Sequence, residues 1–149
     1  MELRLLCVGD IVGGPGRQAL REGLAVLIPE RRIDCVIVNA ENAAAGSGLT
    51  PALYDKMLHY GTDLFTLGDH IYRRREIIPL LERSDRIVKP ANLPVAAPGK
   101  EFAVCQTKSG HRVAVVSLLG RMFMKQPVNC PFAAVDRALA AIPKDVKIA

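Results

Sequence analysis

The chain has 149 residues, 50% of them hydrophobic and 23% charged, a length that fits one domain with a core of its own. It carries 20 Lys and Arg residues against 15 Asp and Glu residues, a net charge of +5, and only 5% of its residues are aromatic. This weak positive charge with few aromatic side chains argues against specific binding of duplex nucleic acid, although it suits a smaller anionic partner. Charged residues interrupt the apolar runs, so no membrane-spanning helix is predicted.

The cysteines lie too far apart in sequence for a CxxC metal or redox motif. They are Cys7, Cys35, Cys105 and Cys130. Cys7 and Cys35 fall within apolar runs, where we expect them to be buried free thiols. The N-terminal residues lack the basic start and the cleavage site of a signal peptide. Together these features predict a protein of the reducing cytoplasm.

The first 90 residues alternate between short apolar runs and segments of helical periodicity, which is typical of a parallel sheet covered by helices. We expect buried strands over 3–8, 33–38 and 64–67 and a tight loop over 13–16. Helices are expected between them: one with its apolar stripe from Ala19 to Ile28, one from Pro51 to Leu58, and a short one over 76–81. Pro29 is expected to help end the first helix, and Thr50 is the predicted N-cap of the second.

The alternation of strands and helices stops in the second half of the chain. Prolines at 90, 94 and 98 predict an irregular segment, and a hairpin is expected from strands at 102–105 and 113–118. A helix is predicted over 131–142 and a last strand over 146–149. The fold class is therefore α/β, with a mixed, mostly parallel sheet flanked by helices. The last strand either finishes the sheet as a short edge, or belongs to a domain of which residues 1–149 are the N-terminal portion.

Polar side chains follow three of the predicted strands where each strand ends. Asp10 follows the first strand, Glu41 follows the second, and Asp69 and His70 follow the third. Because the carboxyl ends of parallel strands meet at one edge of a sheet, these side chains are expected to lie close together. Three neighbouring carboxylates need a compensating cation, and oxygen ligands with one imidazole suit a divalent metal. A two-metal site would stabilise displacement at phosphorus.

Other interpretations of these residues stay open. Asp10 could simply cap a helix, Glu41 could be a solvated loop residue, and His70 could pack against its neighbours. The glycine-rich segment Gly14–Ala19 fits G-x-G-x-x-A, and with Glu41 it outlines a Rossmann-like nucleotide-binding module without catalysis. That match is weak, because four residues separate Gly9 from Gly14. The basic run over 73–75 is either a solvated surface or an attractant for an anionic substrate.

Several sequence blocks occur in an order that resembles the YmdB-like metallophosphoesterases of the calcineurin-like superfamily. The blocks are Gly9–Gly13, Asn39–Ala44, Gly46–Thr50, Leu67–His70 and Lys89–Asn92. The resemblance runs from about residue 3 to the end of the chain and implies a metallophosphoesterase-like fold. It further implies hydrolysis of phosphodiesters, including 2′,3′-cyclic nucleotides, with two divalent metal ions, most commonly iron or manganese.

The resemblance also implies roles for individual residues. Asp10 is similar to a ligand of one metal, Glu41 to a carboxylate shared by both metals, and Asn42 to an amide that contacts substrate or supports a ligand. Asp69 takes the position of an asparagine ligand to the other metal. His70 is similar to the histidine that helps to protonate the leaving oxygen.

Two departures from the family pattern bear on this hypothesis. Asp69 replaces the expected asparagine, which adds negative charge beside Glu41. The family also supplies histidine ligands from segments that would follow residue 149, and neither His59 nor His111 matches them, so both are expected to have no role. We therefore expect an N-terminal portion of a phosphodiesterase; the alternatives are the Rossmann-like module and an inactive remnant.

Overall fold

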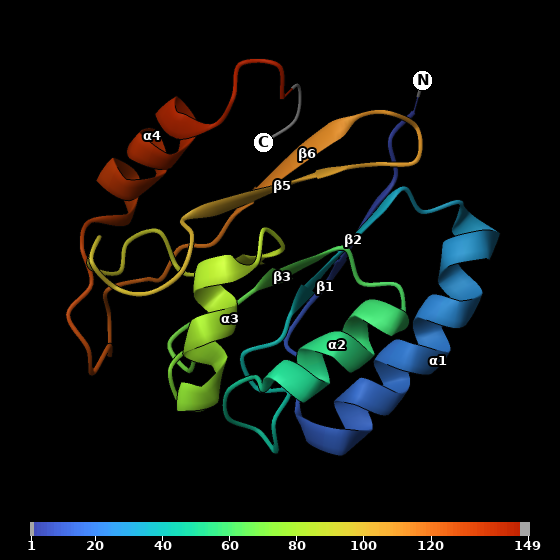
Figure 1. Cartoon of the computed structure of the whole chain (residues 1–149), viewed down its shortest axis with the longest axis horizontal. Helices are drawn as coiled ribbons and strands as arrows, with labels where there is room; N and C mark the ends of the chain where they lie inside the picture. Colours follow the sequence, from blue (N-terminus) through green and yellow to red (C-terminus); the bar gives the residue numbers. More distant parts are fainter. Residues whose placement is uncertain (1, 147–149) are drawn as a thin grey trace.

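The computed structural model describes residues 2–146 and contains a four-stranded parallel sheet with the strand order β1-β2-β3-β4 (Figure 1). The strands are β1 (Leu5–Val8), β2 (Cys35–Asn39), β3 (Leu64–Thr66) and β4 (Ile87–Val88). The predicted mostly parallel α/β arrangement is confirmed. Among the residues described, no helix has the length and apolar character needed to cross a membrane.

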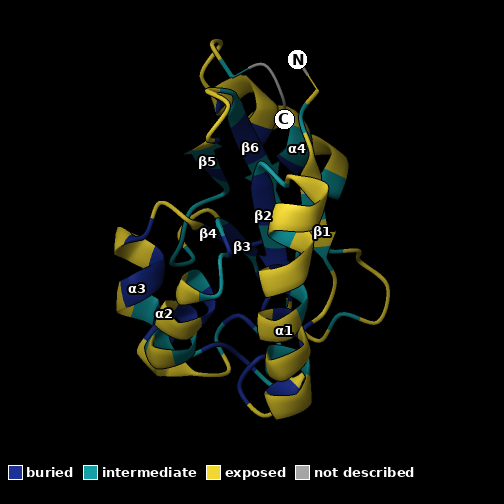
Figure 2. Ribbon diagram, turned by 90° about the vertical axis from the view of Figure 1, so that its right-hand side faces the viewer, coloured by how far each residue is buried: buried dark blue, intermediate teal, exposed yellow. Residues whose placement is uncertain are grey.

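Three helices pack against one face of this sheet. They are α1 (Gly13–Arg31), α2 (Pro51–His59) and α3 (Ile78–Arg83), the last preceded by a 3₁₀ turn, η1 (Arg75–Ile77). Side chains of all three helices share one hydrophobic core with the sheet. Figure 2 shows the outer surface of α1 exposed and the central strands buried. The buried strands explain why their sequences are nearly continuous apolar runs.

The start of α2 follows the predicted chemistry. Thr50 has an extended backbone, and its Oγ1 accepts a hydrogen bond from the Leu53 backbone N–H at 3.2 Å. Pro51 occupies the first helical position, where its missing N–H has no intrahelical partner to lose. This start fixes the direction in which the chain leaves the loop that follows β2.

The expectation of a tight loop over residues 13–16 is wrong, because this segment is the first turn of α1. Gly13 has a positive φ of 56° that turns the chain into the helix, and Pro15 is tolerated because first-turn N–H groups need no intrahelical acceptor. At the other end, α1 continues past Pro29 and ends at Arg31, where Arg32 adopts the left-handed conformation. The glycine segment is therefore helical. The Rossmann-like alternative requires a glycine-rich loop at this position, and the structure has none there.

The first strand is also not buried as expected. Leu5 is 37% exposed, and Cys7 is exposed whereas Cys35 is fully buried. The reason is position in the sheet: β1 is an edge strand, and β2 lies between two neighbours. An apolar run predicts a strand, but the tertiary arrangement decides how many of its sides are covered.

The predicted hairpin consists of β5 (Phe102–Gln106) and β6 (Arg112–Val116), paired as an antiparallel two-stranded sheet of its own. Isolated parallel bridges from β4 and the segment after it connect this hairpin to the main sheet. It covers the second face of the sheet, where the Sγ atoms of Cys35 and Cys105 lie 3.3 Å apart. The hydrogen bond between these thiols and burial raise the pKa of Cys35, so it remains a protonated packing group.

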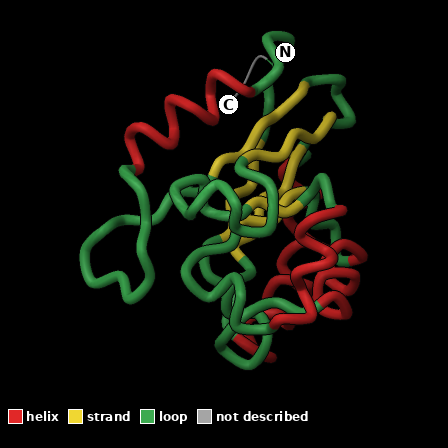
Figure 3. Tube along the Cα trace, turned by 60° about the vertical axis from the view of Figure 1, so that its left-hand side comes forward, coloured by secondary structure: helices red, strands yellow, loops and turns green. Residues whose placement is uncertain are grey.

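The last helix, α4 (Pro131–Ala141), lies on the side of the strands opposite to α1, α2 and α3 (Figure 3). Its buried residues Ala134 and Ala138 pack against Ala91 and Val116. Of the strand expected over 146–149, Val146 lies in no strand, and residues 147–149 lie outside the described residues.

The irregular segment after β4 is held by two buried polar side chains. Lys89 is 1% exposed, and its Nζ donates hydrogen bonds to the carbonyls of Pro94, Val95 and Ala97 at 3.3, 3.1 and 2.6 Å. Burial lowers the pKa of Lys89.

Asn92 is fully buried and ties down the loop that leads to α4. Its Nδ2 donates to the carbonyls of Leu119 and Asn129 at 2.8 and 3.2 Å, and its Oδ1 accepts from the Leu119 N–H at 2.8 Å. Lys89 and Asn92 therefore shape the loops between β4 and α4.

Replacement of Asn92 by alanine is expected to lower the free energy of unfolding by about 2–3 kcal/mol, because it leaves buried backbone groups without partners. Chemical denaturation followed by circular dichroism measures this change. Asn129→Ala is the matched control, because the Asn129 residue is exposed and only its backbone groups are bonded to Asn92. Equal destabilisation by both substitutions would contradict the assignment.

Candidate functional site

The candidate site lies at the carboxyl ends of the first three parallel strands. β1 is followed by Asp10, β2 by Glu41 and Asn42, and β3 by Asp69 and His70. All five residues come within two to four positions of the end of a strand, so their backbone is positioned by the sheet. The structure brings Glu41, Asp69 and His70 together, as the sequence predicted, and it connects Asp10 to them through Asn42.

The register of the sheet places these ends side by side. Val8 pairs with Val38, and Asn39 pairs with Thr66, so the three strands end at nearly the same level. Beyond the strands, the Ala40 N–H still donates to the Thr66 carbonyl at 3.1 Å. The polar loops consequently start as neighbours rather than diverging.

One amide side chain connects all three loops. Asn42 Nδ2 lies 3.0 and 2.8 Å from the two carboxylate oxygens of Asp10, and Asn42 Oδ1 lies 2.5 Å from His70 Nδ1. The backbone carbonyl of Asn42 also accepts hydrogen bonds from the backbone N–H groups of Gly13 and Gly46, both at 3.0 Å. Because an amide oxygen only accepts, His70 Nδ1 must carry the hydrogen, and Nε2 is left available for other work.

Glu41 is held from two sides. Its Oε1 lies 3.4 Å from Asn39 Nδ2, and its Oε2 accepts from the His70 backbone N–H at 3.3 Å. The carboxylate also packs directly over Gly68, where an added Cβ would lie only 2.6 Å from Glu41 Cδ. A methyl group at position 68 would therefore displace the Glu41 carboxylate from its present position.

Three side chains have the spacing and chemistry of a cation site. Glu41, Asp69 and His70 each offer one ligand atom, and these atoms lie within 4.8 Å of one another. Asp69 is half exposed, and its Oδ2 lies 3.7 Å from His70 Nε2. The carboxylate oxygens of Glu41 and Asp69 match the ligands of divalent first-row metals, so these donors fit such an ion. The free nitrogen of His70 beside them either joins the ligands or, if it stays off the metal, can transfer a proton. Asp10 lies outside this group of three and is connected to it through Asn42.

Two residues that shape this site were given no role from the sequence. Asn39 ends β2 and accepts a hydrogen bond from the Glu41 N–H at 3.2 Å, in addition to its contact with the Glu41 carboxylate. Gly68 provides the space that this carboxylate fills. The asparagine two residues before Glu41 was visible in the sequence, whereas the contact between Gly68 and Glu41 joins separate loops and was not.

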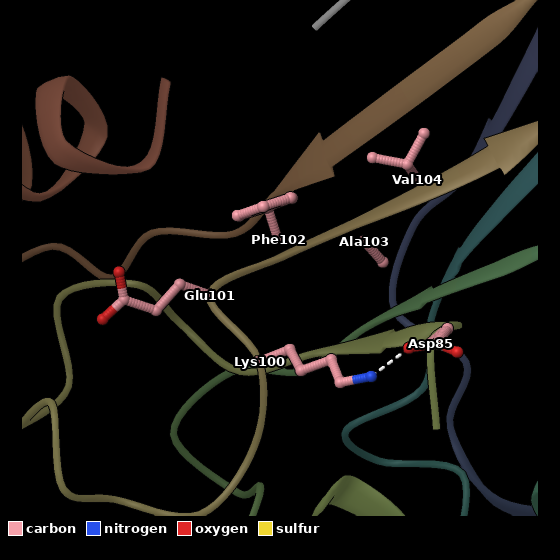
Figure 4. A pocket seen from close by; sticks show the side chains of 6 residues that line it. All are labelled: Asp85, Lys100, Glu101, Phe102, Ala103 and Val104. Carbon is pink, nitrogen blue, oxygen red and sulfur yellow. Dashed lines mark hydrogen bonds and ion pairs between the residues drawn. The ribbon is translucent and has the colours of Figure 1, made fainter. Parts of the chain in front are cut away.

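The cavity drawn in Figure 4 lies elsewhere and measures about 530 Å³. It is lined by Asp85 and by residues 100–104, with an ion pair between Lys100 and Asp85. None of the predicted site residues lines it. Volume alone therefore does not identify the candidate site in this fold.

Comparison with known proteins places these features in a family. The model of the family described as YmdB-like protein matches residues 6–149. A protein of Bacillus subtilis strain 168, named 2′,3′-cyclic-nucleotide 2′-phosphodiesterase, is 35% identical over 142 residues. The match covers 95% of this chain and 53% of that protein. The chain thus spans about half the length of this curated relative.

Solved structures show the same fold. A hypothetical protein from Thermus thermophilus superposes with a TM-score of 0.85 at 38% identity, covering 95% of this chain and 54% of that one. A phosphatase from Mycoplasma pneumoniae superposes with a TM-score of 0.84 at 24% identity and covers 95% and 52%. The second likeness supports the fold alone.

The contact between Gly68 and Glu41 gives a direct test of the site geometry. We expect Gly68→Ala to weaken Mn²⁺ binding at least ~10-fold, because the new methyl group displaces the Glu41 carboxylate. Isothermal titration calorimetry with Mn²⁺ measures the change. Gly9→Ala is the matched control, since a Cβ at Gly9 meets nothing within 4 Å. Unchanged Mn²⁺ affinity in Gly68→Ala would contradict the geometry.

Proposed function

The chain belongs to the YmdB-like protein family, and we propose that it carries the strand-end part of a metal-dependent phosphodiesterase site. The proposed substrates are phosphodiesters of the 2′,3′-cyclic nucleotide class, the class that the name of the Bacillus subtilis relative states for that protein. The proposed cofactors are two divalent ions, iron or manganese. The free thiols of the chain support a reducing, cytoplasmic location.

The observation that carries the proposal is the convergence of Glu41, Asp69 and His70, whose ligand atoms lie within 4.8 Å of one another. Asp10 extends the acidic surface on the other side of Asn42. Acidic groups that lie this close repel one another, so a bound cation stabilises the arrangement. Glu41, Asp69 and Asp10 are the proposed metal-holding residues.

Divalent cations bound by these residues would lower the pKa of coordinated water and stabilise negative charge at phosphorus. Asn42 holds His70 through Nδ1, which fixes the imidazole ring and directs Nε2 away from the amide. His70 Nε2 is the proposed donor of a proton to the leaving oxygen, a role that suits an imidazole at neutral pH. Asn42 is the proposed positioning residue, because it touches both Asp10 and His70.

The proposal predicts that Glu41→Gln lowers Mn²⁺ affinity, because it removes a charge from the centre of the cluster. The loss should exceed the ~10–100-fold that is typical when a residue that only hydrogen-bonds a metal ligand is replaced. Calorimetric titration with Mn²⁺ and hydrolysis of 2′,3′-cyclic AMP with added Mn²⁺ are the two measurements. The matched control is Glu82→Gln, an exposed residue of α3 that lines none of the site. Retention of Mn²⁺ binding in Glu41→Gln would refute the assignment.

The aspartate at position 69 is expected to strengthen metal binding and to make the site less electrophilic, since it adds a negative charge beside Glu41. Asp69→Asn should therefore weaken Mn²⁺ affinity about tenfold and raise turnover when Mn²⁺ is saturating. Asp55→Asn, an exposed change on α2, serves as the control. If both affinity and turnover stay the same in Asp69→Asn, the charge at this position has no such effect.

A further inference from the structure

A second cleft adjoins the candidate metal cluster. It measures about 370 Å³ and is formed by the loop after β3 and by the loop that precedes α4. Its lining residues are Asp69, Tyr72, Arg73, Met124, Lys125 and Gln126. Asp69 belongs both to this cleft and to the cluster with Glu41 and His70. A ligand in the cleft would therefore lie next to the proposed reaction centre.

Three side chains of this cleft, those of Arg73, Lys125 and Gln126, carry N–H donors that lack acceptors among the described residues. Within residues 2–146, neither Arg73 nor Lys125 has a hydrogen bond or an ion pair through its side chain. Gln126 Nε2 is buried and has no hydrogen-bond partner there. By contrast, the guanidinium of the neighbouring Arg74 donates to the Ser47 carbonyl at 3.2 Å and so helps to hold two loops together.

The remaining walls are fixed and partly apolar. Tyr72 donates its hydroxyl to the Pro98 carbonyl at 2.7 Å, which holds the ring in place. Burial raises the pKa of Tyr72, so the hydroxyl remains a donor. Met124 adds a flexible apolar side chain beside it. These surfaces suit the sugar or base of a nucleotide, while the donors suit an anionic group.

We propose that this cleft binds a second phosphate group of the substrate, on the 5′ side of the nucleoside whose phosphodiester reacts. The proposal rests on the proposed function and narrows it to substrates with more than one phosphate, such as short oligonucleotides. Arg73 and Lys125 supply two positive charges, and Gln126 supplies a buried donor, which together match phosphate oxygens. The Asp69 carboxylate in the same cleft is compensated by the cation that it holds under the proposed function.

The test is calorimetric titration of the chain, in the presence of Mn²⁺, with adenosine 3′,5′-bisphosphate and with adenosine 3′-monophosphate. We expect the bisphosphate to bind at least ~10-fold more tightly, with a preference that falls as salt is raised. Arg73→Ala and Gln126→Glu should remove this preference; Gln126→Glu keeps the shape of the side chain and adds a repelling charge. Arg75→Ala, an exposed change in the same basic run, should keep it.

Two results would overturn the second-phosphate site: equal affinities for the two nucleotides in the unmodified chain, or equal losses of preference in Arg73→Ala and Arg75→Ala. Failure of the proposed function has a different signature. In that case, binding of the monophosphate would not depend on Mn²⁺ and would be the same in Glu41→Gln. If monophosphate binding depends on Mn²⁺ but the bisphosphate binds no more tightly, the proposed metal centre is supported and the second-phosphate site in the cleft is wrong.

Discussion

The common direction of β1, β2 and β3 is the constraint on which the site depends. Parallel strands must end at the same edge of a sheet, and the pairing of Val8 with Val38 and of Asn39 with Thr66 keeps those ends level. A shift of one residue in this register would turn the alternating side chains to the opposite faces. The apolar packing of the sheet on both faces therefore fixes the position of polar loops that contribute little to the core.

Within those loops, polar contacts hold the acidic groups at short range. Asn42 bridges Asp10 and His70, while Asn39 and the His70 backbone hold Glu41. The ligand atoms of Glu41 and Asp69 lie within 4.8 Å of each other, so a bound cation would offset the repulsion between their charges. Such repulsion is the kind of local conflict that folded proteins retain at functional sites, where a ligand relieves it.

Much of this architecture follows from local sequence patterns. The apolar runs predicted the strands, and the Thr50–Pro51 cap predicted the start of α2. The acidic residues and His70 that follow the first three strands predicted that these loops would meet at one edge of the sheet. The exposure of β1 was not predicted, because the number of neighbours of a strand is a tertiary property. The helical start at Gly13 was mistaken for a loop, because three glycines and a proline resemble turn chemistry. The cleft joins Asp69 to Gln126, which are distant in sequence and share no local pattern.

The central claim is that the loops after the parallel strands hold divalent cations. Anomalous diffraction from crystals of the chain soaked in Mn²⁺ examines this claim directly. We predict an anomalous peak within ligand distance, about 2.0–2.6 Å, of the carboxylate oxygens of Glu41 and Asp69. Bound Mn²⁺ found elsewhere on the molecule, with no peak beside these carboxylates, would contradict it.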